Sequence, residues 1–178
     1  MYVKDSWYLG NYIEHELKYP GNYGAKGEKR KKKKKPTPEQ IRRQNQYNRE
    51  VKYRRLLRFN FFPGDFWVTL KYKKGTRRTM EQLGKDRDKF LRILRGKFRK
   101  LGHELKWIGR IEIGKRGGLH MHFVINRIPG EVHTDLIIRD AWKRVTEAGS
   151  IDYTTIWEQG GCEGLAKYIT KQADEQIA

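Results

Sequence analysis

The sequence predicts an α+β fold of the ferredoxin-like (split βαβ) type, an antiparallel sheet with helices on one face, plus a basic helical extension at the N-terminus. From residue 66 onward, strand and helix patterns alternate as strand–helix–strand–strand–helix–strand, the order of the split βαβ motif. A length of 178 residues suits one domain with an appendage. A hydrophobic content of 37% is enough for one core.

The extension is expected to cover residues 1–60, ahead of a sheet domain over residues 61–178. Residues 1–25 are rich in aromatic side chains and could form a loose pair of strands or stack on nucleobases. Thr37, Pro38 and Gln40 carry the pattern of a helix start, with Thr37 as N-cap and Gln40 closing a capping box. The helix should run over about residues 38–57, with Ile41, Tyr47, Val51 and Leu56 as its few apolar anchors.

The elements of the sheet domain follow from the spacing of apolar residues. Alternation of apolar and polar positions predicts strands, and an apolar stripe recurring every three or four positions predicts helices. The expected strands are 66–72, 105–113, 119–125 and 151–157, and the expected helices are 79–101, 134–145 and 163–176. The glycine-rich stretch 114–118 should connect the two middle strands as a hairpin.

Composition narrows the partners and the compartment. A net charge of +19 predicts a polyanionic partner, nucleic acid before membrane. Cys162 is the single cysteine, which excludes an internal disulfide and a cysteine-based zinc site. The chain has no apolar run long enough for a transmembrane helix, and its start lacks the apolar core of a secretory signal. We therefore expect a soluble, cytoplasmic protein with no membrane partner.

Positive charge is concentrated between residues 26 and 58, which hold 15 Lys and Arg residues and three acidic ones. The helix in this segment could lean on the domain as a solvated helix, or it could grip a phosphate backbone, which we favour. The residues expected to bind nucleic acid are Lys31, Lys32, Lys33, Arg42, Arg43, Arg54, Arg55, Lys115 and Arg116.

His120 and His122 lie two apart in a strand pattern, so their side chains should share one face of the sheet. A five-residue connection pairs Glu112 with His120 across the hairpin, about 5 Å away. Two imidazoles and a carboxylate can converge on one metal ion and leave coordination positions open. The alternative is a pair of satisfied, half-buried histidines without a ligand.

Tyr168 and Lys171 lie three apart in the last predicted helix and should share a face of it. Taken alone, such a pair is most simply an aromatic at the edge of the core and a surface charge. Downstream of a histidine pair in a basic chain, a hydroxyl and an ammonium suggest metal-assisted chemistry on a phosphodiester.

Three blocks in this order resemble the HUH endonuclease superfamily, specifically the rolling-circle replication initiators (Rep proteins) of plasmids, filamentous phages and single-stranded DNA viruses. The first block is the strand pattern Phe66–Tyr72. The second is Leu119–Ile125, which contains His–hydrophobe–His, and the third is Ala166–Lys171. The resemblance covers residues 66–171 and leaves the first 60 residues unmatched.

The resemblance implies an HUH nuclease domain over residues 61–178 that nicks and rejoins single-stranded DNA and so initiates rolling-circle DNA replication. By analogy, His120 and His122 would hold Mg²⁺ or Mn²⁺, with Glu112 as a third ligand. Tyr168 would attack the DNA and become 5′-phosphotyrosine, and Lys171 would assist. The implied partners are single-stranded DNA or an origin hairpin and a host polymerase and helicase, in the cytoplasm of a bacterial host. No nucleotide-binding Gly-x-x-x-x-Gly-Lys-Ser/Thr motif for a helicase is present.

Three other interpretations stay open. A single-tyrosine transposase or relaxase would carry the same site. A metal-independent RNA endonuclease on a ferredoxin-like fold could also use histidine and tyrosine. A non-catalytic module that binds single-stranded nucleic acid would instead use aromatic residues of the sheet for stacking.

Overall fold

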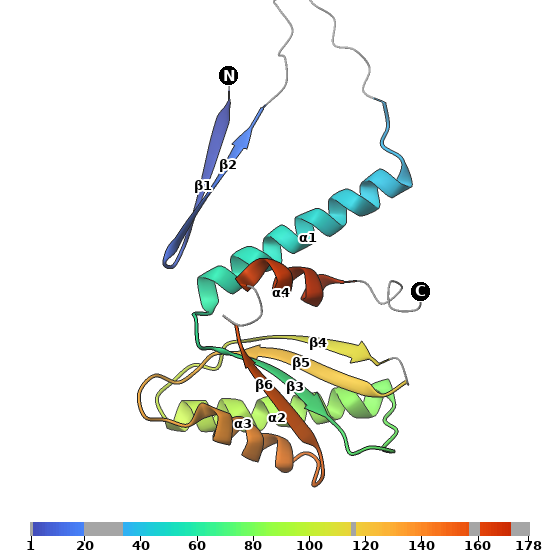
Figure 1. Ribbon diagram of the computed structural model, residues 1–178, viewed down its shortest axis with the longest axis vertical. Coiled ribbons are helices and arrows are strands. Elements are labelled where there is room, and N and C mark those ends of the chain that lie inside the picture. Colours follow the sequence, from blue (N-terminus) through green and yellow to red (C-terminus); the bar gives the residue numbers. More distant parts are fainter. Residues whose placement is uncertain (1, 20–33, 115–116, 157–160, 172–178) are drawn as a thin grey trace, which may run out of the picture.

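The computed structural model describes residues 2–19, 34–114, 117–156 and 161–171 (Figure 1). Its elements in chain order are β1 (Val3–Leu9), β2 (Tyr12–Lys18), α1 (Pro38–Asn60), β3 (Phe66–Lys71), α2 (Met80–Lys100), β4 (Trp107–Ile113), β5 (Leu119–Ile125), α3 (Thr134–Lys143), β6 (Ser150–Thr155) and α4 (Gly161–Thr170). No helix in the described part of the chain is long and apolar enough to cross a membrane.

Strands β3 to β6 form one antiparallel sheet in the order β4-β5-β3-β6. The two strands at the centre, β3 and β5, are not consecutive in the chain, because α2 and β4 lie between them. Helix α3 then connects β5 to the edge strand β6. This is the split βαβ arrangement. The α+β, ferredoxin-like fold class predicted from the sequence is confirmed, whereas the expectation of helices on one face of the sheet holds for α2 and α3 but not for α4.

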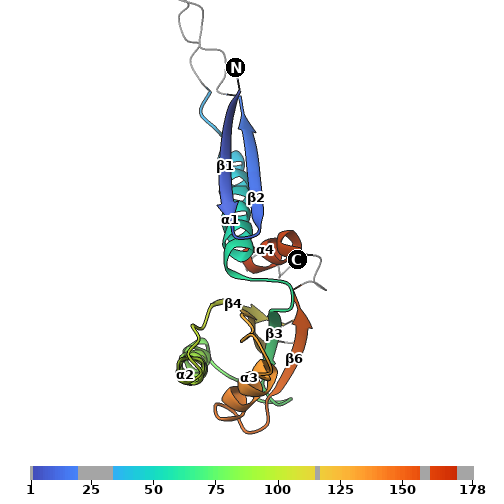
Figure 2. The same ribbon diagram turned by 90° about the vertical axis from the view of Figure 1, so that its left-hand side faces the viewer.

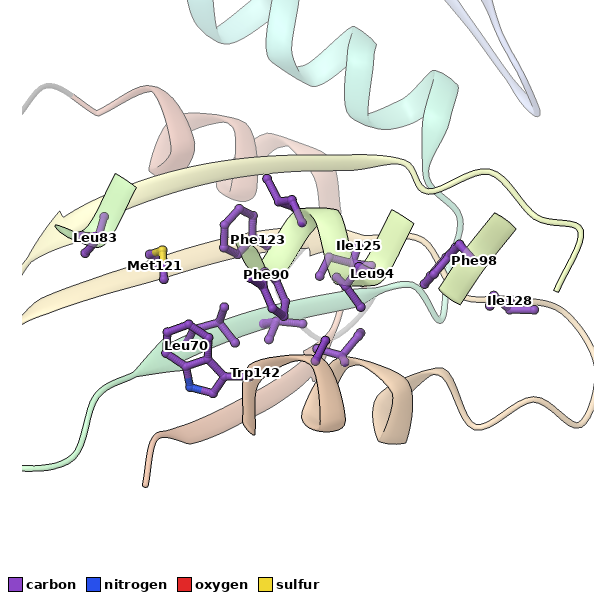
Figure 3. Close-up of a cluster of buried hydrophobic side chains, with 14 residues drawn as sticks. Leu70, Leu83, Phe90, Leu94, Phe98, Met121, Phe123, Ile125, Ile128 and Trp142 are labelled. Carbon is purple, nitrogen blue, oxygen red and sulfur yellow. The ribbon is translucent and has the colours of Figure 1, made fainter. Parts of the chain in front are cut away.

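Helices α2 and α3 cover one face of this sheet and enclose the main core (Figure 2). The apolar stripe of α2 buries Phe90 and Leu94 against Phe123 of β5, and Trp142 of α3 packs beside Leu70 of β3 (Figure 3). All five side chains are buried. Side chains on a strand alternate faces, so this core leaves the opposite face of the sheet for the histidines.

The opposite face is partly covered by α4, which lies between the sheet and α1 (Figure 1). Leu165 and Ile169 of α4 and Leu57 of α1 are buried in one apolar cluster with Val124 of β5. Leu165 and Ile169 therefore dock α4 on the face of the sheet opposite the main core.

Helix α1 starts as predicted, with the Thr37 hydroxyl accepting from the Gln40 amide and the Gln40 side chain accepting from the Thr37 amide. Three of its four predicted anchors are wrong, since Ile41, Tyr47 and Leu56 are exposed, whereas Val51 is half-buried. Leu57 takes their place because it faces α4, which the local sequence does not reveal. Helix α1 therefore packs on the domain, while a phosphate-binding role for its exposed cations stays a prediction, as does the domain boundary near residue 60.

The N-terminal residues form a hairpin of β1 and β2, which confirms the interpretation as a pair of strands. Its turn places Gly10 at a φ of 62°, where glycine costs least. The hairpin is held to α1 by Glu14 of β2, whose carboxylate pairs with Arg54 at 2.8 Å and Arg55 at 2.9 Å. The Arg55 guanidinium also lies 3.5 Å from the centre of the Trp7 ring.

Helix α4 extends to Thr170 and Lys171 lies just beyond it, whereas residues 172–176 of the predicted helix lie outside the described residues. The Tyr168 carbonyl accepts from the Lys171 amide at 3.4 Å and from the Arg110 side chain. The Thr170 carbonyl likewise accepts from Gln46 of α1, at 3.5 Å. Contacts from β4 and α1 thus add to the local hydrogen bonds at the end of α4.

Candidate active site

The strand register brings the predicted site residues to one face of the sheet. Glu112 of β4 pairs with His120 of β5, as predicted from the length of the connection. His122 is flanked by Arg110 on β4 and by Thr69 on β3. These five residues alternate with core residues along their strands, so they face α4 and not α2.

His122 is the more firmly held of the two histidines, with only 7% of its surface exposed. Its Nδ1 lies 3.0 Å from the Thr69 hydroxyl, which can donate or accept and so suits either tautomer of the ring. The Trp67 ring stacks on the imidazole at an angle of 9°. Burial lowers the pKa of His122, although the neighbouring Glu112 acts in the opposite direction. The ring is therefore suited to stay neutral at neutral pH, with Nε2 directed toward Glu112.

Tyr168 of α4 reaches the same point from the other side. Its hydroxyl donates a hydrogen bond to the Glu112 carboxylate and lies 3.2 Å from His122 Nε2. His122 Nε2 in turn lies 2.7 Å from Glu112 Oε2. A phenol, a carboxylate and an imidazole thus meet although they come from three different elements.

The protonation of this group follows from its contacts. Burial acts to raise the pKa of Glu112, but the hydrogen bond from Tyr168 and the nearby His122 outweigh it, and the pKa is lowered. Burial and the acceptor Glu112 raise the pKa of Tyr168, against the opposing effect of Arg110. The arrangement at neutral pH is an ionised carboxylate that accepts from a protonated phenol.

Arg110 is a residue of this site that the sequence analysis missed. Its guanidinium lies 5.3 Å from the centre of the Tyr168 ring and donates to the Tyr168 carbonyl. A cation at this place interacts favourably with the negative C-terminal end of the α4 dipole. Its contact with the Tyr168 ring also helps to hold the nucleophile candidate in position. The available signal was the alternation of β4, which puts Arg110 on the same face as Glu112.

The three predicted metal ligands fit a divalent ion in donor type, because imidazole nitrogen and carboxylate oxygen both bind such ions. Glu112 and His122 converge, whereas the ring centre of His120 lies 6.5 Å from that of His122. Within the described ranges, no group of three or more His, Cys, Asp or Glu side chains is close enough to hold a metal. The His120 ring packs beside Gly114, where a Cβ would approach it to 3.2 Å. Metal binding stays a prediction.

Lys171 lies at the rim of the site. Together with Tyr168 and Lys167 of α4 and Gln46 and Glu50 of α1, it lines a hollow of about 360 Å³. Helix α1, which belongs to the N-terminal extension, therefore forms one wall of the space beside Tyr168.

The residues predicted to bind nucleic acid fall into three groups. Arg42 and Arg43 are exposed on α1, and Arg43 pairs with Glu39 at 2.6 Å. Arg54 and Arg55 are mostly covered and pair with Glu14 of the hairpin, so they also have a structural role. The remaining predicted residues, Lys31, Lys32, Lys33, Lys115 and Arg116, lie outside the described residues.

Comparison with known proteins places this site in a family. No curated protein and no solved structure matches the chain. A family model for the replication-associated protein ORF2 matches residues 65–173, which is more than half of the chain. The match begins just before β3, ends just after α4 and includes the residues that meet at Tyr168. The chain therefore belongs to the replication-associated protein ORF2 family, a family of replication initiators.

Proposed function

We propose that this protein starts rolling-circle DNA replication by nicking and rejoining single-stranded DNA, with Tyr168 as nucleophile in an HUH-type site. One observation carries the proposal: the Tyr168 hydroxyl meets His122 and the Glu112 carboxylate on the sheet face. Replication initiation is the role of the family. A covalent nick suits that role, because it leaves a free 3′-OH for a polymerase and retains the phosphodiester's energy for rejoining.

Glu112 and Arg110 are suited to activate the phenol. Tyr168 donates its proton toward the ionised Glu112 carboxylate, which can act as proton acceptor. The phenolic oxygen then forms a bond to phosphorus, the bond from phosphorus to the 3′ oxygen breaks, and that oxygen takes up a proton. Arg110, over the Tyr168 ring, favours the phenolate because its charge opposes the rise in the pKa of Tyr168.

His120, His122 and Glu112 are the residues that would hold Mg²⁺ or Mn²⁺. When bound, such an ion neutralises the non-bridging oxygens of the phosphate as a Lewis acid. Thr69 would keep the His122 ring oriented through Nδ1 and leave Nε2 for the ligand position. The ammonium of Lys171, in the hollow beside Tyr168, is suited to pair with a phosphate oxygen.

Two other tyrosines of the sheet domain make poorer nucleophiles. The Tyr72 hydroxyl donates to Asp86 of α2, and the Tyr153 hydroxyl donates to the Asp135 carbonyl of α3. Both rings pack against the main core on the far side of the sheet from His122. Burial, with Asp135 adding to its effect, raises the pKa of Tyr153 to about 12.

The test is to incubate the protein with circular single-stranded DNA and Mn²⁺ and to look for a protein–DNA adduct that survives SDS. We expect the adduct with the native chain and none with Tyr168→Phe, which loses only the phenolic oxygen. His120→Ala combined with His122→Ala should abolish Mn²⁺ binding by calorimetry and cleavage, with little loss of DNA affinity. An adduct in the Phe variant, or undiminished metal-dependent cleavage in the double variant, would overturn the proposal.

The same assay separates two of the three remaining candidates, the RNA endonuclease and the binding module, from a nicking enzyme. A transposase or relaxase would form the same adduct, and the replication-associated family match favours the initiator over both. An RNA endonuclease would cleave RNA without Mn²⁺. A binding module would retain the DNA without cutting it.

A further inference from the structure

Three hollows follow α1 from the hairpin to the nucleophile candidate. The largest, a groove of about 680 Å³, lies between the hairpin and α1, and a second of about 230 Å³ lies between α1 and α4. The third is the hollow of about 360 Å³ beside Tyr168. Tyr47 and Val51 line both the first and the second hollow, while Glu50 and Lys167 line both the second and the third. The shared lining residues place the three hollows side by side around α1, and together they are here named the strand track.

We propose that the strand track binds the single strand of DNA that adjoins the scissile phosphate, so that the hairpin and α1 guide the strand to Tyr168. The proposal rests on the proposed function for the identity of the reaction at its inner end. It assigns a role to β1, β2 and α1, which lie outside the family match at residues 65–173.

Exposed aromatic rings support a nucleobase as the occupant. Tyr47 is 56% exposed and Phe59 is 55% exposed, and both line the groove between hairpin and helix. They are separated by twelve positions, or about 18 Å along the helix axis. Successive bases of a single strand stack on such rings without regard to sequence. Gln44 and Asn48 on the same wall offer amide groups for hydrogen bonds to bases.

Charge along the track favours a polyanion. Three acidic residues line it, and of these Glu16 pairs with Arg55 at 3.2 Å. The basic residues that line it outnumber them and are Lys18, Lys52, Arg54, Arg55, Lys167 and Lys171. An excess of cations beside exposed aromatic rings is typical of grooves for single-stranded nucleic acid. Lys18, Arg54 and Arg55 already pair with carboxylates of the chain. Among the described residues Lys52, Lys167 and Lys171 have no ion pair, and an apolar protein partner would leave these three without counter-charges.

The test measures binding without cleavage. The full chain with Tyr168→Phe is titrated against a labelled single strand of about 20 nucleotides and followed by fluorescence anisotropy. Adding Tyr47→Ala and Phe59→Ala should weaken binding at least about tenfold, because each lost ring removes a stacking partner. Both rings are more than half exposed, so the thermal transition should be kept.

Two further variants make the comparison specific. Tyr47→Phe, made with Phe59 left in place, keeps both rings and should bind DNA as tightly as the Tyr168→Phe parent. Tyr8→Ala removes a tyrosine that is 75% exposed on β1 and lines none of the three hollows, so it should bind like the parent.

The proposed binding of DNA in the strand track would be refuted if the variant with Tyr47→Ala and Phe59→Ala bound DNA as tightly as the parent. It would also be refuted if Tyr8→Ala weakened binding as much as that double variant. So would unchanged DNA binding together with altered self-association in sedimentation, which would make the groove a protein interface. If the native chain forms no covalent adduct yet the double variant loses DNA binding, the nicking function fails while the track stands.

Discussion

Replacing Leu57 by alanine tests whether α1 is part of the structure that holds the nucleophile candidate. The Leu57 side chain is completely buried and packs in one cluster with Leu165, Ala166 and Ile169 of α4. Removing such a side chain costs roughly 2–5 kcal/mol, because transfer energy is lost and a cavity is left. For a chain of this length each kcal/mol lowers the melting temperature by about 2–4 °C. We therefore expect the melting temperature to fall by roughly 4–20 °C.

Leu56→Ala is the matched control. It removes the same side chain one position earlier, where 39% of the residue is exposed, and should cost at most about 1 kcal/mol. Thermal denaturation followed by circular dichroism compares the two variants. Since α4 carries Tyr168, the Leu57 variant should also form the adduct more slowly at a temperature where it is folded. Equal melting temperatures would refute the reasoning and would favour an extension that is independent of the domain.

Three further substitutions probe the packing and the site. Gly109→Ala should destabilise the protein by about 1–3 kcal/mol, because a Cβ there would lie 2.5 Å from the Phe123 ring. Gly96→Ala is the control in α2, where the added Cβ has open space around it, and should stabilise the protein by about 0.5–1 kcal/mol. Urea denaturation that gave the same sign for both changes in the free energy of unfolding would contradict the packing described. Thr69→Val should weaken Mn²⁺ binding about 10- to 100-fold in calorimetry, since it removes the hydroxyl that orients His122; an unchanged affinity would exclude that orienting role.

Features that depend on residues close together in the chain could be predicted from the sequence. Strand β5 has the predicted bounds, Leu119–Ile125. Helix α1 begins at the predicted capping box, because Thr37 and Gln40 satisfy each other's backbone without help from the rest of the fold. The pairing of Glu112 with His120 was also predictable, since the length of a hairpin connection fixes the register.

The parts that were missed depend on contacts between distant segments. Thr69 orients His122 only because β3 lies next to β5, and the two residues are 53 positions apart in the chain. Arg110 binds the end of α4 only because α4 crosses that face of the sheet. The burial of Leu57 rather than Leu56 likewise follows from where α4 lies. Local patterns of polarity contain none of this information.

The most direct test of the central claim identifies the residue that carries the DNA. The adduct formed on single-stranded DNA with Mn²⁺ would be digested with nuclease and trypsin, and the peptide that retains nucleotide would be sequenced by mass spectrometry. Tyr168 lies between Lys167 and Lys171, so trypsin should release it in a short peptide. We expect a nucleotide on Tyr168 alone. A nucleotide on Tyr72, Tyr153 or any other residue would contradict the account.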